Sequence, residues 1–429
     1  MNDTKSQVRQ GCAEKHRRIE IALLALILAV GIFLRLSPRM FAEGEPLHSL
    51  RALHPSPGFT QIGFDEHLYD QYVATLIKRG ISSYPDMVDD YIAIQTKLPG
   101  AILPPVRFLY IFSAYLWHSL FGGDPLTALN QVAALFSVLT LGLTAIFARR
   151  LGGPAAGLGV AALMAVAPTQ LHMSQHALID GFFAFWALLC VWLLWENLRK
   201  PRSSILLIGY GLSLAALVLT KENSFFVGVA LVVLLATNRW LKFGTVTREL
   251  LLVTVAGPLL GIVILVFLAG GLHNLISTYE LLVAKAWQTP YAVLTGDGPW
   301  YRYLVDLLLV SPLILILALG TAFRLDLAKK PELYLLTFVA ASYVVMCNVK
   351  YGMNLRYANM WDMPLRFLAF SQIVAFASLT KRWRGPIVAT AVVLLAGTEL
   401  RQYLILAVQF PLYELITHDL LRALHILKP

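Results

Sequence analysis

Charged side chains are scarce in this sequence. Asp, Glu, Lys and Arg make up 14% of the 429 residues, whereas they make up about 25% of an average soluble domain. Hydrophobic residues make up 58% of the chain, and its mean hydropathy is +0.66. This composition excludes an ordinary soluble domain and predicts a helical integral membrane protein.

Cysteine is also rare, and its positions exclude two kinds of scaffold. Cys12 lies in a polar stretch, whereas Cys190 and Cys347 lie far apart in apolar runs. These spacings fit neither a disulfide framework nor a zinc site. No paired-aspartate motif is clearly built for a divalent cation either. We therefore expect that no cofactor is required, although a divalent metal is not excluded.

Internal repeats, low-complexity segments and a soluble domain are lacking as well. We therefore expect one membrane-embedded domain that covers residues 1–429. The net charge of +10 would suggest a nucleic-acid partner in a soluble protein. Here the basic residues form short clusters between apolar runs, which is the pattern that sets membrane topology. We expect a lipid bilayer and no nucleic acid as the partner.

Eleven apolar segments are long enough to cross a bilayer, which takes about 20 residues each. The first follows the basic residues Lys15, Arg17 and Arg18 and has the length of an uncleaved signal anchor. The eleven segments are 19–36, 126–148, 155–172, 180–197, 204–220, 224–238, 250–270, 304–323, 332–348, 364–379 and 386–407.

A twelfth apolar segment, 99–121, contains two prolines, an arginine and a histidine. If it does not cross, all five basic clusters of the later loops fall on the cytoplasmic side together with the N-terminus, as the positive-inside rule requires. If it crosses, those clusters move outward. We therefore expect 99–121 to be re-entrant or interfacial, with the N-terminus inside and the C-terminus outside. The membrane would be a bacterial or archaeal plasma membrane, or that of the endoplasmic reticulum.

This topology places several polar residues at the outer ends of helices, where ionisable groups are candidates for a functional site. They are Asp65, Glu66, Gln175, His176, Asp180, Lys221, Glu222, Asn223, Arg356 and Tyr357. Each has an alternative explanation. Asp65 can start the amphipathic helix predicted over 67–80, Asp180 can cap a span, His176 can be a loop residue, and Lys221 and Arg356 can extend toward lipid headgroups.

Two long outer segments complete the predicted organisation. The first, 37–125, is expected to carry interfacial helices. The second, 271–303, has the length of a functional loop, and we interpret it as a lid. An ordinary interfacial helix followed by a turn is the alternative.

The ordered set of short motifs resembles one family of membrane enzymes, the GT-C glycosyltransferases that use polyprenyl-phosphate sugars. The group resembled contains the dolichyl-phosphate-mannose protein mannosyltransferases and the aminoarabinose transferase of lipid A. The matching pieces are Asp65 and Glu66 followed by Tyr69 and a helix that ends at Gly80, then 103–105, 148–153, 167–168, 174–176 with Asp180, 219–222, 299–301, and 355–357 before Pro364.

Two departures from the family pattern are visible. Leu103 precedes the double proline, where the family usually has His or Lys, and the nearest basic residues are Lys97 and Arg107. Gln175 and His176 stand where family members often have an arginine. The first departure puts in doubt any binding of the donor phosphate at this point.

The resemblance implies an inverting transfer of a sugar from a polyprenyl-phosphate donor to an acceptor hydroxyl at the outer face. It implies Asp65 as the general base, with Glu66 as its substitute, and a donor-phosphate site at Arg356, Lys221 and Tyr357. Asp180 and His176 would orient the base or bind the sugar, and Lys97 and Arg107 are further candidates. The acceptor, whether protein, lipid or glycan, stays open. Alternatives are a transporter or flippase of polyprenyl-linked sugars, or a GT-C oligosaccharide transferase or ligase.

Overall fold

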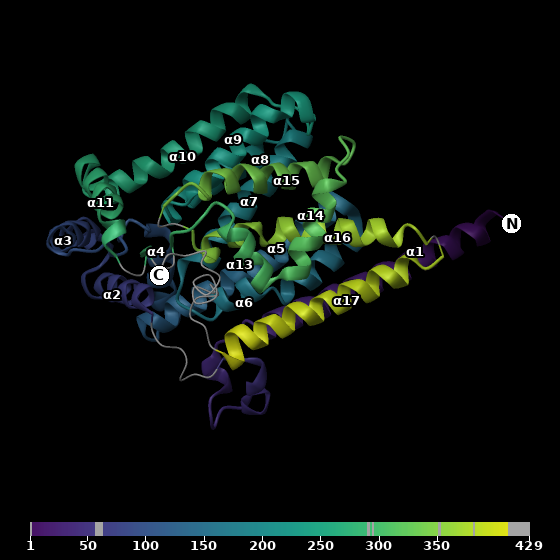
Figure 1. Cartoon of the computed structure of the whole chain (residues 1–429), viewed down its shortest axis with the longest axis horizontal. Coiled ribbons are helices and arrows are strands. Elements are labelled where there is room, and N and C mark those ends of the chain that lie inside the picture. The colour runs from purple at the N-terminus through teal and green to yellow at the C-terminus, as the bar shows by residue number, and fades with distance from the viewer. Residues whose placement is uncertain are drawn as a thin grey trace.

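The computed structural model describes residues 2–55, 63–289, 292–293, 296–350, 353–380 and 382–410. Within these ranges the chain forms helices and connecting segments and contains no strand. This confirms the all-helical fold. Figure 1 shows long helices along the molecule, with the short helices α2, α3 and α11 gathered at one end and the start of α1 at the other.

The N-terminal half contains helix α1, the short helices of residues 37–125 and helices α5 to α8. The bounds are α1 Asn2–Phe33, η1 Pro38–Phe41, η2 His48–Leu53, α2 Phe64–Arg79, η4 Ile81–Ser83, α3 Tyr84–Lys97, α4 Phe108–Phe121, α5 Pro125–Ala165, α6 Pro168–Ser174, α7 Ile179–Arg199 and α8 Ser204–Thr220. Helix α2 confirms the helix predicted after Asp65, and its apolar face is buried.

The second half alternates long apolar helices with short elements at the ends of the bundle. The bounds are α9 Ser224–Leu241, α10 Arg248–Leu268, α11 Leu272–Lys285, η5 Ala286–Gln288, α13 Arg302–Val310, α14 Pro312–Phe323, α15 Lys330–Met346, η6 Leu355–Trp361, α16 Asp362–Ala377, α17 Arg384–Tyr403 and the π-helical η7 Leu404–Gln409.

Five of the described helices are long and apolar enough to cross a membrane: α5, α7, α9, α10 and α17 with its η7 extension. Shorter apolar helices accompany them, and together they make the chain an integral membrane protein. Within 99–121, helix begins only at Phe108, and 14 residues extend about 21 Å, which is less than the roughly 30 Å of a hydrocarbon core. Helix α4 is thus too short to cross alone, while the number of spans stays a prediction.

Helix α5 is a tight hairpin of two antiparallel parts. Gly153 takes φ 81° at the turn, a conformation that costs little for glycine. The Ser137 hydroxyl donates to the carbonyl of Gln170 over 3.3 Å, although these residues lie on opposite sides of the turn. The second and third predicted spans therefore run antiparallel, as the topology requires.

Two predicted spans are each divided into two helices. The segment 155–172 breaks after Ala165 and restarts at Pro168 as α6. The segment 304–323 breaks at Ser311 and restarts at Pro312 as α14. In both places proline occupies the first helical position, because it lacks the N–H that a continuing helix needs.

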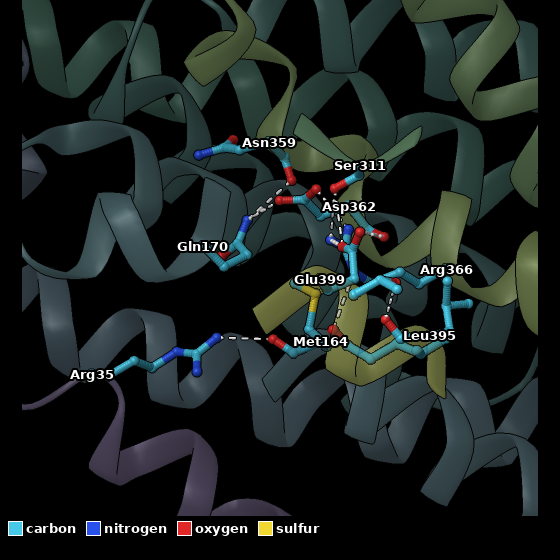
Figure 2. A network of polar contacts seen from close by, with 11 residues as sticks. Arg35, Met164, Gln170, Ser311, Asn359, Asp362, Arg366, Leu395 and Glu399 are labelled. Atoms are coloured by element: carbon cyan, nitrogen blue, oxygen red, sulfur yellow. Dashed lines mark hydrogen bonds and ion pairs between the residues drawn. The ribbon is translucent and has the colours of Figure 1, made fainter. Parts of the chain in front are cut away.

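The break after Ala165 leaves backbone carbonyls without helical partners, and two buried arginines bind them. Arg35 donates to Ala165 O over 2.9 Å and to Met164 O over 3.0 Å, and Arg366 donates to Leu163 O over 3.3 Å. Figure 2 shows Arg35 reaching Met164 from one side and Arg366 lying on the other. Unsatisfied carbonyls are costly in an apolar interior, so these arginines stabilise the break.

The basic loop residues lie at the opposite end of the helices from the predicted site. Asp180 is in the first turn of α7, whereas Glu196 is in its last turn, where it accepts two hydrogen bonds of 2.8 and 2.7 Å from Arg150. Lys330, at the start of α15, donates over 2.6 Å to Leu241 O at the end of α9. The chain thus has one end rich in loop cations and another that holds the candidate site.

Candidate active site

Four sequence-predicted residues form one chain of ion pairs at the end of the bundle. Arg356 Nη2 donates to Asp65 Oδ2 over 2.7 Å, and Arg356 Nε lies 3.7 Å from Asp180 Oδ2. The other oxygen of Asp180 accepts from Lys221 Nζ over 2.6 Å. Helices α2, α7 and η6 and the residue that follows α8 supply these side chains, so residues almost 300 positions apart in the sequence meet here.

The burial of the cations rules out extension toward headgroups as their explanation. Lys221 is 3% exposed and Arg356 is 5% exposed, and both are engaged in the ion pairs above. Tyr357 covers them, with its ring centroid 3.9 Å from Lys221 Nζ and 5.4 Å from Arg356 Cζ. Such cation–π contacts further stabilise desolvated cations.

The structure assigns different positions to the two neighbouring carboxylates. Glu66 is buried, and its oxygens accept hydrogen bonds from the Gly63 amide at 2.9 Å and the Ala177 amide at 2.6 Å. Burial alone would raise the pKa of Glu66, but His176 and the two amides together lower it. Glu66 therefore fastens the start of α2 to the loop before α7, and Asp65 is the more accessible of the two.

Asp65 lies at the start of α2, as the alternative explanation expects, but it is not the N-cap of this helix. Gly63 is the N-cap of α2, and the residue that accepts its amide hydrogen is Glu66. Asp65 lies in the first turn of the helix and directs its carboxylate to Arg356. A first-turn aspartate is stabilised by the helix dipole. The position of Asp65 is therefore compatible both with stabilising the start of α2 and with a role in the site.

His176 does join the site, through Glu66 instead of Asp65. Its Nδ1 lies 3.4 Å from Glu66 Oε1, and its ring centroid is 4.6 Å from that of His172 on α6. Both histidines are buried. We did not single out His172 from the sequence, although its spacing of four residues from His176 could have indicated it.

Arg107 and Glu222 form a second ion pair beside the first, in which Arg107 is buried and the Glu222 side chain is 30% exposed. The Arg107 guanidinium contacts both oxygens of Glu222, with Nε 3.1 Å from Oε2, and donates to the Tyr69 hydroxyl over 2.6 Å. Burial would raise the pKa of Glu222, but Arg107 and Lys221 lower it. Of the two further candidates, Arg107 therefore borders the site, whereas Lys97 is exposed at the end of α3.

Tyrosine hydroxyls hold the double-proline segment that precedes Arg107, and no local sequence pattern indicates these hydrogen bonds. Tyr72 donates to Leu103 O over 2.6 Å, and Tyr91 donates to Ile102 O over 3.2 Å. These bonds fix a non-helical backbone whose carbonyls would otherwise be unsatisfied. The segment thus delivers Arg107 to Glu222 without being helical itself.

The segment that carries Arg356 is anchored to the bundle by amide side chains. Asn359 Nδ2 donates to the Asp180 carbonyl over 2.7 Å, and Gln170 Nε2 donates to Asn359 O over 3.2 Å and to Asp362 Oδ2 over 2.8 Å. Figure 2 shows Gln170 reaching toward Asn359 and Asp362. Asp362 in turn pairs with Arg366 over 2.8 Å. Arg366 also donates to Leu163 O, so these side chains connect η6 to the helix break after Ala165.

The second outer segment is fastened onto the first. Lys285 at the end of α11 donates to Leu98 O over 2.6 Å and to Thr96 O over 3.0 Å, and Thr289 accepts from the Ala101 amide over 2.8 Å. The helix α11 fits the interfacial-helix alternative for 271–303, and a lid function stays a prediction. Part of the turn predicted after it, including Thr295, lies outside the described residues.

A metal centre is not apparent in the part of the chain that the structure describes, where no group of three His, Cys, Asp or Glu side chains is placed to hold an ion. The charges of the site instead pair with one another. What the arrangement offers chemically is carboxylates for proton transfer and buried cations for binding an anion.

A family model described as "Dolichyl-phosphate-mannose-protein mannosyltransferase" matches residues 60–278. The chain belongs to this family. The match includes Asp65, Asp180, Lys221 and Arg107, and it ends before Arg356. No curated protein matches the sequence significantly.

Solved structures show the same fold at low sequence identity. The oligosaccharyltransferase of Archaeoglobus fulgidus in the apo form has a TM-score of 0.60 and 14% identity over 92% of this chain. ArnT from Cupriavidus metallidurans in the apo state has a TM-score of 0.50 and 15% identity over 95% of this chain and 77% of its own. The chain spans 56% of the length of the archaeal protein. These likenesses establish the GT-C fold.

Proposed function

We propose that this protein is an inverting glycosyltransferase that moves a sugar from a polyprenyl-phosphate donor to an acceptor hydroxyl. The observation that carries the proposal is the chain of ion pairs Asp65, Arg356, Asp180 and Lys221 at one end of the membrane helices. It unites a carboxylate near the surface with two buried cations. Family membership and the fold support it. One solved relative, of the same archaeal type, is a complex with an inhibitory peptide and a dolichol-phosphate.

In the proposed reaction the acceptor oxygen attacks the anomeric carbon of the donor sugar from the face opposite the phosphate. The new C–O bond forms as the bond from the anomeric carbon to the phosphate oxygen breaks, and the phosphate leaves with the electron pair. Asp65 takes the proton of the acceptor hydroxyl. Arg356 and Lys221 stabilise the leaving phosphate, so the chemistry requires no metal.

The position of Asp180 does not suit the sugar-binding role that the family resemblance implies. Both of its oxygens face cations and its side chain is 3% exposed, which leaves little room to bind sugar hydroxyls. We infer that Asp180 is a positioning residue that holds Lys221 and Arg356 side by side. His176 is a positioning residue as well, because it contacts Glu66 and thereby helps to orient the start of α2.

A transporter is disfavoured by the position of the charges. Transporters place substrate sites near the middle of the bilayer, between internal repeats, whereas this site lies at helix ends. An oligosaccharide transferase is a second candidate, because the archaeal oligosaccharyltransferase has the higher TM-score of the two relatives above. The two enzymes differ in the group that they transfer.

The proposal is tested by incubating the purified protein with polyprenyl-phosphate sugars and candidate acceptors. We expect release of polyprenyl phosphate and a product heavier by one sugar residue, with inverted anomeric configuration, measured by mass spectrometry and NMR. Transfer of a block of several sugars would favour the oligosaccharide transferase. No release of polyprenyl phosphate from any donor, by protein that is folded, would contradict both.

We further propose that the site faces the outer side of the membrane, because this orientation keeps the basic loops in the cytoplasm. After replacement of the native cysteines, single cysteines at Asp86 and Glu280 are expected to react with an impermeant thiol reagent in intact cells. Cysteines at Arg202 and Asp326 are expected to react only after lysis. All four positions are exposed, so unequal labelling reports the side of the membrane, and the reverse pattern would place the site inside.

A further inference from the structure

The central charges of the site already neutralise one another. Asp65 and Asp180 carry two negative charges, and Arg356 and Lys221 carry two positive ones, in direct contact and largely buried. A sugar phosphate ester brings an additional negative charge. An anion placed among paired charges is repelled by the carboxylates as well as attracted by the cations, so its net attraction is reduced. A phosphate can therefore bind well only if it takes a cation from a carboxylate.

Asp65 is the member of this group nearest the surface, and it contacts Arg356, whose own side chain is 5% exposed. The side chain of Asp65 is 16% exposed, whereas those of Lys221 and Asp180 are 2% and 3% exposed. Lys221 is further held by the ring of Tyr357 over its ammonium group. A phosphate that approaches from the surface thus meets Arg356 and Asp65 before it meets Lys221.

The contacts of Arg356 with Asp65 and with Asp180 are made by different nitrogens of its guanidinium. Its backbone amide donates to Asn354 Oδ1 over 3.0 Å, and its Nε remains 3.7 Å from Asp180. The contact with Asp65 is made by Nη2, at the far end of the guanidinium. A small rotation of this planar group can exchange a carboxylate for two phosphate oxygens, which its fork fits well.

We propose that the donor phosphate displaces Asp65 from Arg356, and that this exchange frees Asp65 to act as the base. The proposal rests on the proposed function and adds the order of events, in which donor binding precedes release of the base. Before the donor binds, the Asp65 oxygen that would receive the acceptor proton is occupied by Arg356. Once the phosphate holds Arg356, this oxygen faces the acceptor hydroxyl. The donor binds first, and the base is released only when there is a sugar to transfer.

The exchange makes an unusual prediction for binding, because Asp65 competes with the donor. Asp65→Asn removes the competing charge and is expected to tighten the binding of polyprenyl phosphate by about tenfold, the scale on which charged hydrogen bonds exceed neutral ones. The measurement is the dissociation constant of dolichyl phosphate and of undecaprenyl phosphate for the purified full-length protein in lipid nanodiscs. Asp65→Ser gives the same test with a smaller neutral side chain if the Asn variant does not fold.

Two controls separate the exchange from a general gain in positive charge. Asp86→Asn removes an equal charge from an exposed position on α3 and is expected to change the dissociation constant by less than about twofold, because solvent screens it. In an Arg356→Gln background, Asp65→Asn is expected to give no tightening, since the group for which the two anions compete is gone.

The outcomes distinguish the exchange from the function on which it rests. If Asp65→Asn binds polyprenyl phosphate no more tightly than Asp86→Asn does, or more weakly, the exchange is wrong. If turnover is nevertheless lost in that variant, the general-base assignment stands. If the unmodified protein binds neither polyprenyl phosphate, the proposed function and the exchange are both overturned.

Discussion

Asp65→Asn is expected to lower the rate of sugar transfer at saturating donor by about 10²–10⁴, the usual contribution of a general base. Asparagine has the same shape as aspartate, so the fold is retained, and the donor still binds, more tightly if the exchange at Arg356 is correct. It cannot take the proton of the acceptor hydroxyl. The measurement is the release of polyprenyl phosphate per enzyme molecule, with a thermal unfolding curve to confirm folding.

Glu66→Gln is the matched control for this variant, because it makes the same change at the next residue. Glu66 binds two backbone amides and lies beside His176. Glu66→Gln is therefore expected to lower the stability of the protein, and to lower the transfer rate of the folded protein less than Asp65→Asn does. A larger rate loss for Glu66→Gln than for Asp65→Asn, in protein of equal stability, would transfer the role of base to Glu66.

Much of the site could be predicted from the sequence because membrane topology restricts where residues can lie. Once the spans alternate in direction, Asp180 at the start of one helix and Lys221 at the end of the next must come out at the same end of the bundle. The positive-inside rule selected the parity without any knowledge of contacts. The contacts among Asp65, Asp180, Lys221 and Arg356 confirm that they lie at one end of the bundle, and the side of the membrane stays a prediction.

The ion pairs within the site could not be predicted from the sequence. Arg356 and Lys221 were assigned to a phosphate as if they were available, and the structure has both in ion pairs with carboxylates. Which cation meets which carboxylate depends on side-chain contacts between residues up to 291 positions apart, and no local pattern records such contacts. The same holds for Tyr72 and Tyr91, whose hydroxyl bonds are invisible to periodicity.

Helix breaks inside apolar runs were missed for a related reason. A hydropathy window averages over Pro168 and Pro312, although each proline marks the first turn of a new helix. The buried Arg35 and Arg366 were a usable signal. An arginine inside or just after an apolar segment needs acceptors, and the carbonyls of a broken helix are a common source of them.

The other large effect is expected at Arg356, where two substitutions separate charge from shape. Arg356→Gln removes the cation and is expected to lower turnover by about 10²–10³, as for the loss of one donor to a developing negative charge. Arg356→Lys keeps the charge but loses the fork that holds two phosphate oxygens, so an intermediate loss of roughly tenfold is expected. The readouts are turnover and the dissociation constant of the donor, measured on protein of confirmed folding.

Arg79→Lys is the matched control, since Arg79 pairs with Asp90 at the surface, where both side chains are more than half exposed, and such pairs contribute little. If Arg356→Lys has the same donor affinity and turnover as this control, Arg356 is not part of the phosphate site.

Lys221→Ala is expected to lower the same two quantities, donor affinity and turnover. If both cations bind one phosphate, the losses of the double variant are less than additive, because removal of either cation already leaves the leaving group poorly stabilised. Fully additive losses would instead mean that the two cations act on different groups, with Lys221 acting through Asp180 alone.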